Sequence, residues 1–227
     1  TVSGISRALG GGVMGLKLAT IPKAERDGVE AEVLEAYDHS LETLSNLGAE
    51  IVEINVPFRF DDCREPHSTI MNSEAYAYFR ELIDDTSSLI DESVRAGISS
   101  GRAISPRQYL DAFELVSRFK AQISDALVGV DALLTPTTET VALEIDGLDL
   151  TRRPVRFTRF VNDLGMCGLA VPNGKSAKGL PTSLQIVCRE NQERLALRIG
   201  LAFEQATDWR LRPSMFRDAD RRQQRAR

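Results

Sequence analysis

The first pattern with chemical meaning is Gly97-Ile-Ser99-Ser-Gly101, which has the G-x-S-x-G spacing of a serine nucleophile on a strand-to-helix turn. Such a serine must follow a strand, because only then does its hydroxyl stand exposed at the top of a sheet. Here residues with helical periodicity precede and follow the pattern, which favours a helix-breaking surface turn. A histidine base is also required, and the two histidines, His39 and His67, fall in an amphipathic helix and an expected loop. We therefore assign no catalytic role to Ser99.

A second pattern, Gly10-Gly-Gly-Val-Met-Gly15, satisfies the G-x-G-x-x-G spacing of dinucleotide-binding loops. Those loops follow a strand and open a helix, so that backbone amides meet the pyrophosphate. In this chain the order is inverted, since the glycines precede a strand, and Leu16 stands where a phosphate-binding loop would have lysine. The spacing therefore predicts a plain loop and no nucleotide cofactor. A free-standing nucleotide-binding domain is the less favoured alternative.

The composition excludes several other classes of function. The formal charge is −5 and the pI is near 5.2, so no general attraction to nucleic-acid phosphates is expected. The three cysteines, Cys63, Cys167 and Cys188, lack metal-ligand spacing and a disulfide pattern, which is typical of a reducing compartment such as the cytoplasm. No apolar run approaches the ~20 residues of a membrane span. We expect no metal, cofactor, nucleic acid or membrane as a ligand or partner.

The elements that must position any site begin with a strand over Gly15–Ile21. Asp27, followed by Glu30, supplies the capping pattern of a helix that Gly48 ends in a left-handed conformation. The β-branched residues of Glu50–Val56 then predict a second strand. Strand, helix and strand in so few residues indicate a parallel pair with a right-handed crossover.

The segment from residue 70 to 128 is predicted to be helical, with a break over Gly97–Ser105 and a long helix that Ser105 caps and Pro106 opens. Gly129 ends that helix. One stripe of it is expected to be buried, formed by Tyr109, Phe113, Val116, Phe119, Ile123 and Leu127.

Three short apolar runs, Ala132–Leu134, Leu169–Val171 and Ser183–Val187, predict strands buried on both faces. A last helix opens at Asn191. The order of elements indicates an α/β fold with a mixed, mostly parallel central sheet flanked by helices. At 227 residues the chain is expected to form a single domain over 1–227, with a polar tail over 217–227.

Four spaced segments carry a resemblance to a known family: Asp131–Pro136, Asn162–Gly165, Val171–Gly174 and Gly179–Ile186. In order and spacing they resemble the C-terminal half of amidase signature family hydrolases. The resemblance implies an α/β/α amidase signature fold. It covers nearly the whole chain.

The resemblance also implies the chemistry. Family members cleave carboxamides or transfer their acyl groups with a serine nucleophile, a second serine on a cis peptide and a lysine. No segment here matches the family's glycine- and serine-rich motif, so we expect these groups from an N-terminal catalytic half and no activity from this chain alone. The expected partners are a small-molecule amide substrate and that half. A homo-oligomer and a non-catalytic, amidase-like scaffold or binding protein remain open alternatives.

The family resemblance places the acyl site near the segment that starts at Phe157, so Thr158, Asn162, Arg156 and Cys167 are the candidate substrate-binding residues. Each has a structural alternative: Asn162 as a helix cap, Cys167 as core packing and Arg156 as a solvated side chain. Amidotransferase members of the family generally carry an aspartate near the position of Val155, which disfavours a glutamine amide. The nearby arginines favour a carboxylate-bearing substrate instead, and they are Arg152, Arg153, Arg156 and Arg159.

Overall fold

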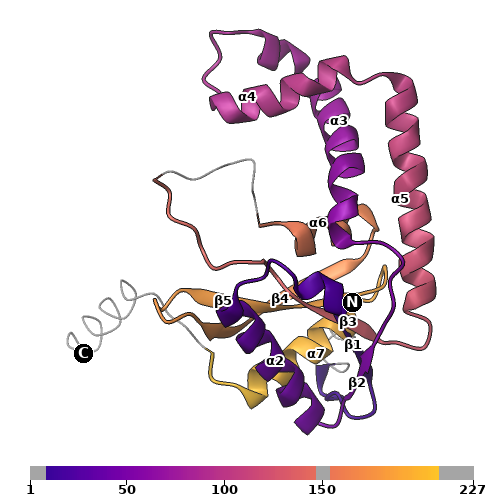
Figure 1. Cartoon of the computed structure of the whole chain (residues 1–227), viewed down its shortest axis with the longest axis vertical. Coiled ribbons are helices and arrows are strands. Elements are labelled where there is room, and N and C mark those ends of the chain that lie inside the picture. The colour runs from indigo at the N-terminus through magenta and orange to yellow at the C-terminus, as the bar shows by residue number, and fades with distance from the viewer. Residues whose placement is uncertain (1–8, 147–153, 210–227) are drawn as a thin grey trace.

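The computed structural model of the chain describes residues 9–146 and 154–209, and the predicted polar tail over 217–227 lies outside them. Figure 1 shows a sheet with helices on both sides and an arm of three helices that projects from it. The strands are β1 (Lys17–Thr20), β2 (Glu50–Glu53), β3 (Ala132–Pro136), β4 (Cys167–Lys175) and β5 (Pro181–Cys188). The helices are α2 (Ala31–Asn46), α3 (Arg64–Asp84), α4 (Glu92–Ser99), α5 (Pro106–Ala126), α6 (Arg156–Asp163) and α7 (Glu193–Ala206). Three short 3-10 turns complete the elements, η1 (Lys23–Arg26), η2 (Phe60–Cys63) and η3 (Ser100–Ala103).

The sheet has the strand order β2-β1-β3-β5-β4 and is mixed, which confirms the predicted α/β class. β1 pairs in parallel with β2 and with β3, so the predicted parallel crossover is confirmed. β5 pairs antiparallel with both β3 and β4, which limits parallel pairing to one side of the sheet. The antiparallel pairing of β4 with β5 follows from the short turn between them, because a turn of that length can only join antiparallel neighbours.

The start of α2 differs from the prediction. The helix begins at Ala31, and its N-terminal neighbour Glu30 makes no side-chain capping bond. The Glu30 carboxylate instead accepts a hydrogen bond of 3.1 Å from Val141 N, so a tertiary contact replaces the predicted Asp27–Glu30 capping pattern. The predicted end is confirmed, since Gly48 follows the helix with a φ of 92°.

Helices α2 and α7 cover one face of the sheet, while α6, η2 and the last turns of α5 pack on the other (Figure 1). Tyr37 of α2 fixes the first face: its hydroxyl donates to Leu134 O at 2.9 Å and accepts from Ile21 N at 3.0 Å. Stacked rings fill the second face, with centroids 4.1 Å apart for Phe60 and Phe160. The two faces together form one continuous core.

The three apolar runs differ in their burial. Every residue of β3 is buried, and β5 is buried from Leu184 onward, as predicted for strands covered on both faces. The prediction is wrong for β4, where Gly168 and Ala170 are exposed. From Cys167 to Pro172 exposed residues alternate with partly or fully buried ones, so only one face of this edge strand is covered.

The arm consists of α3, α4 and α5. Ser105 caps α5 in a capping box with Gln108, as predicted. The buried stripe of α5 is confirmed only in its second half: Phe119, Ile123 and Leu127 are buried, whereas Phe113 is 41% exposed. That first half lies beyond the sheet and packs against α3 (Figure 1). Within the described part of the chain, no helix combines the length and hydropathy of a bilayer span.

Candidate functional site

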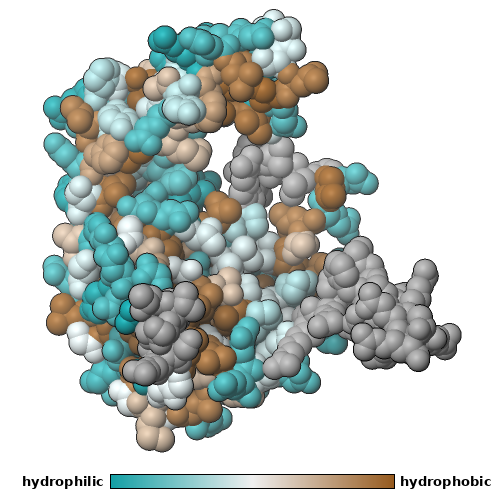
Figure 2. Space-filling model, turned by 180° about the vertical axis from the view of Figure 1, so that it is seen from behind, coloured by the Kyte–Doolittle hydropathy of each residue, from teal (hydrophilic) through white to brown (hydrophobic). Residues whose placement is uncertain are grey.

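The candidate site is a cavity of about 510 Å³ between the arm and α6. Figure 2 shows the molecule hollowed below α4, with apolar side chains above the hollow. Three elements supply the described lining residues: His67, Ser68, Met71 and Asn72 from α3; Ser93, Val94, Gly97 and Ile98 from α4; and Thr158, Arg159 and Asn162 from α6, with Val155 just before it. The volume and mixed lining are those of a small-molecule site.

The sequence of α6 explains why its polar residues face the cavity. Phe157 and Phe160 are fully buried against the core, so the helix presents its opposite side to the hollow. Thr158 and Asn162 lie four residues apart and therefore share that side. A left-handed Gly165, with a φ of 63°, follows the helix and lets the chain turn into β4.

Thr158 and Asn162 are the two predicted site residues that the structure brings together in the cavity. Thr158 Oγ1 donates to Val155 O at 3.2 Å, which leaves the hydroxyl's lone pairs free to accept. Asn162 lies in the last turn of α6 and is exposed, so the alternative that it caps a helix start is wrong. Its amide can both donate and accept.

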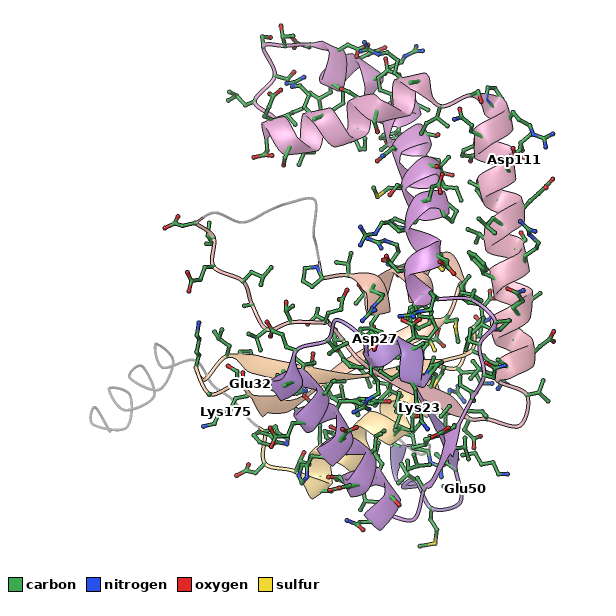
Figure 3. All side chains as sticks on the ribbon, viewed as in Figure 1. Lys23, Asp27, Glu32, Glu50, Asp111 and Lys175 are labelled. Carbon is green, nitrogen blue, oxygen red and sulfur yellow. The ribbon has the colours of Figure 1, made fainter. Side chains whose placement is uncertain are left out.

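Arg156 does not line the cavity, and its side chain is 10% exposed. Its guanidinium donates to Asp27 O at 3.1 Å and to Glu25 O at 3.2 Å, and it lies 4.7 Å from the centroid of the Phe157 ring. Figure 3 shows Asp27 close to the ribbon of α6. The carboxylates of Glu25 and Glu139 lie 3.8 and 3.9 Å from the guanidinium. The geometry gives Arg156 a structural task, namely to hold the connection before α2 against α6.

Cys167 also lies outside the cavity lining. It opens β4 directly opposite Cys188, and its Sγ lies 3.3 Å from Arg189 O. The thiol is partly buried, which agrees with the packing alternative. Of the four predicted site residues, Thr158 and Asn162 therefore line the cavity. Arg156 and Cys167 lie outside its lining and pack within the surrounding structure.

Two further lining residues carry chemistry: His67, which the sequence did not assign to a site, and Arg159, one of the arginines expected to favour a carboxylate-bearing substrate. His67 lies in the first turn of α3, so its expected position in a loop is wrong, and its Nδ1 lies 2.6 Å from Asp163 Oδ1. Arg159 also lines the cavity, and its Nη1 lies 3.8 Å from Asp61 Oδ1. Because 96 residues separate His67 from Asp163, no local spacing could have indicated their contact.

The misleading motifs are placed as expected. Ser99 is the last residue of α4 and is followed by η3, so no strand precedes it. Gly10–Gly15 lies in the turns before β1, which is the inverse of the order needed to cradle a pyrophosphate. His39 lies on α2, exposed and far from the cavity lining.

The described lining of the cavity contains one permanent charge, the Arg159 guanidinium, and no carboxylate. Over residues 9–146 and 154–209, no group of three or more histidine, cysteine, aspartate or glutamate side chains is placed to hold a metal ion. The arrangement is suited to hydrogen bonding a neutral or anionic small molecule.

Comparison with known proteins identifies the family of this chain. A family model described as Amidase matches residues 7–197. The chain is 32% identical to a glutamyl-tRNA(Gln) amidotransferase subunit of Geobacter metallireducens, over 90% of this chain and 48% of that protein. It is 31% identical to an amidase of Pseudomonas putida, over 93% of this chain and 47% of that protein.

Solved structures show the same fold. An amidase crystal structure superposes with a TM-score of 0.79 at 23% identity, over 87% of this chain and 47% of the other. A bacterial aryl acylamidase of the amidase signature enzymes superposes with a TM-score of 0.77 at 20% identity, over 90% and 46%. The chain thus spans about half the length of the relatives that it matches. On the family match, the shared fold and the order of its segments, this chain belongs to the amidase family.

Proposed function

We propose that this chain forms one wall of the substrate pocket, and part of the sheet, of an amidohydrolase that cleaves a carboxamide C–N bond through an acyl-serine intermediate. The observation that carries the proposal is the hollow in which Thr158 and Asn162 meet residues of α3 and α4. A cavity of about 510 Å³ has room for a small amide. Hydrolysis of amides is also the activity that the name of the Pseudomonas putida relative denotes.

The nucleophile and its base are assigned to a polypeptide segment outside these 227 residues. The environment of the lysines supports this assignment. Lys17, Lys23, Lys120, Lys175 and Lys178 are all exposed, whereas a lysine base needs burial to favour its neutral form. The placement of Ser99 at the end of a helix supports it further.

The pocket wall recognises the amide through hydrogen bonds. The Asn162 carboxamide can donate to the substrate carbonyl and accept from its N–H, and the Thr158 hydroxyl can accept. Val155 lies on the lining, near the position at which amidotransferases resembling this chain generally carry an aspartate, and this difference favours an amidase over a glutamine-dependent transferase. Arg159 gives the pocket its preference for carboxylate-bearing amides, because its guanidinium lines the cavity. The guanidinium of Arg156 is instead hydrogen-bonded to backbone carbonyl oxygens.

Kinetics of the protein encoded by the whole reading frame around this chain test the proposal. Ammonia release from a panel of primary carboxamides is the readout. Thr158→Val and Asn162→Leu are each expected to raise KM about 2- to 10-fold, the effect of one lost hydrogen bond. Asn46→Leu, at the exposed end of α2, is the matched control and leaves KM unchanged. Absence of ammonia release from every amide, by a folded protein, contradicts the proposal.

A fluorophosphonate probe separates this function from that of a non-catalytic scaffold. Labelling is expected on a serine outside this chain, located by peptide mapping. A labelled serine within the chain contradicts the assignment of the nucleophile. A folded whole protein that takes no label favours the scaffold.

A further inference from the structure

His67 and Asp163 form a close pair beneath the cavity, and the proposed wall function does not use them. The pair joins the first turn of α3 to the last residue of α6, with 2.6 Å between His67 Nδ1 and Asp163 Oδ1. The side chains are 25% and 10% exposed, respectively. His67 lines the cavity, whereas Asp163 lies below the lining.

The contact fixes which ring nitrogen of His67 is left for a ligand. An aspartate carboxylate only accepts, so the neutral imidazole must carry its proton on Nδ1 to make this hydrogen bond. In that neutral tautomer Nε2 carries no proton, and its lone pair points away from Asp163. Asp163 Oδ2 is buried and accepts no hydrogen bond from the described residues, so His67 is the polar partner that the carboxylate holds.

The described groups around the pair do not compete for the lone pair of His67 Nε2. The charged neighbour on α6 is Arg159, whose Nη1 lies 3.8 Å from Asp61 Oδ1 of η2. Cys63, also on η2, is buried and uncharged, because burial raises the pKa of its thiol to about 12. The described lining offers hydroxyl and amide groups of Ser68 and Asn72 beside His67, and no carboxylate.

We propose that His67, held in one tautomer by Asp163, is a specificity-determining residue whose Nε2 accepts a hydrogen bond from the N–H of the substrate amide. The inference rests on the proposed amidohydrolase function and assigns to this pocket the ability to distinguish an amide from an ester. An ester of the same acid has an oxygen where the amide has its N–H, so it offers Nε2 no donor. Asp163 acts as a positioning residue, through the tautomer of His67.

Paired kinetics of the whole protein with benzamide and methyl benzoate, which share one acyl group, test this inference. His67→Leu is expected to lower kcat/KM for benzamide about 2- to 10-fold relative to methyl benzoate, the effect of one lost hydrogen bond. His67→Gln should restore part of the ratio, because its Oε1 can accept the same N–H. Asp163→Asn should lower the ratio as well. His39→Leu, on the exposed side of α2, is the control with no expected change. An equal loss for both substrates overturns the proposal and leaves His67 as a structural residue.

Binding keeps the test independent of turnover. Calorimetry of benzamide with the wild-type protein and with His67→Leu is expected to show a weaker affinity for the variant by the same factor. Equal affinities, with equal thermal stability, overturn the inference. If the wild-type protein binds benzamide but hydrolyses neither substrate, the amidohydrolase function fails, and the affinity ratio still decides the role of His67.

Discussion

Gln185 and Thr135 meet beneath α6, where Gln185 Nε2 donates a hydrogen bond of 3.0 Å to Thr135 Oγ1. The same nitrogen donates a second bond of 2.7 Å to Phe157 O, at the start of α6. Both hydrogens of one buried amide are therefore engaged, and they tie β3, β5 and α6 together. Thr135 and Gln185 belong to two of the four spaced segments that identify the family, so those segments are the supports of the cavity wall.

Gln185→Leu is expected to lower the free energy of unfolding by about 1–3 kcal/mol, because it leaves the buried Thr135 hydroxyl without its donor. The side chain is 5% exposed, so water cannot replace the lost bonds. Urea denaturation of the two proteins measures the difference. Gln205→Leu, exposed on α7, is the matched control, with an expected change within about 0.5 kcal/mol. Equal losses for both variants would contradict the structural role of Gln185.

The two arginines of α6 are expected to separate stability from binding. Arg156→Ala leaves the carbonyl oxygens of Glu25 and Asp27 without their donor, while Arg59 still pairs with the Glu25 carboxylate at 2.7 Å, and it should cost about 1–3 kcal/mol of stability. Arg159→Gln, at the cavity, should cost less stability and raise KM for carboxylate-bearing amides more than for neutral amides. Denaturation curves and a substrate panel measure the two effects. Arg107→Ala, whose side chain is 84% exposed, serves as the stability control.

If Arg159→Gln raises KM equally for carboxylate-bearing and for neutral amides, the proposed preference for carboxylate-bearing substrates is wrong. If the Arg156→Ala protein is as stable as the wild type but binds substrate more weakly, Arg156 is a substrate-binding residue.

Local patterns predicted the elements, because capping and periodicity act over a few residues. Ser105 with Pro106 opens α5, and Gly48 follows α2 in a left-handed conformation, as expected. The exposure of Phe113 could not be predicted, since the helical period does not say where a helix leaves the core. The antiparallel pairing on one side of the sheet could not be predicted either, because the strand order depends on contacts between residues far apart in sequence.

The cavity was predicted only in part, for a related reason. The family resemblance indicated α6, and Thr158 and Asn162 lie on its open side. The contribution of His67 depends on α3 crossing the end of α6, which is a tertiary contact with no local signal. The structural role of Arg156 could not be predicted, because the backbone carbonyls of Glu25 and Asp27 that its guanidinium binds lie about 130 residues away in the sequence.

Stability is expected to fall at alkaline pH through the buried thiols. Burial, reinforced by the Asp163 carboxylate, raises the pKa of Cys63 to about 12, whereas an unfolded thiol titrates near ~8.5. A raised folded pKa gives stabilisation that is complete below the unfolded value and is lost as pH rises toward the folded one. The stability difference between the wild-type protein and Cys63→Ala should therefore shrink from pH 8 to pH 11, a range that covers most of the interval from ~8.5 to about 12.

Denaturation at several pH values measures that difference. Ile83→Val is the control, because Ile83 is buried and has no titratable group, so its cost should stay constant with pH. A difference for Cys63→Ala that does not change with pH would contradict the prediction.

Within the arm, η3 and α4 are held against α3 by a close approach that only glycine permits. A Cβ at Gly101 would lie 2.0 Å from Asn72 O, whereas a Cβ at Gly97 would meet nothing within 4 Å. Gly101→Ala must therefore push η3 and α4 away from α3, with an expected loss of about 1–3 kcal/mol and weaker amide binding. Gly97→Ala lies inside α4 and should instead stabilise the protein by about 0.5–1 kcal/mol. Thermal denaturation of both variants, with calorimetry of benzamide, measures these effects. Opposite signs of the two stability changes support the packing of η3 and α4 on α3, and a neutral Gly101→Ala would show that α4 does not depend on this contact.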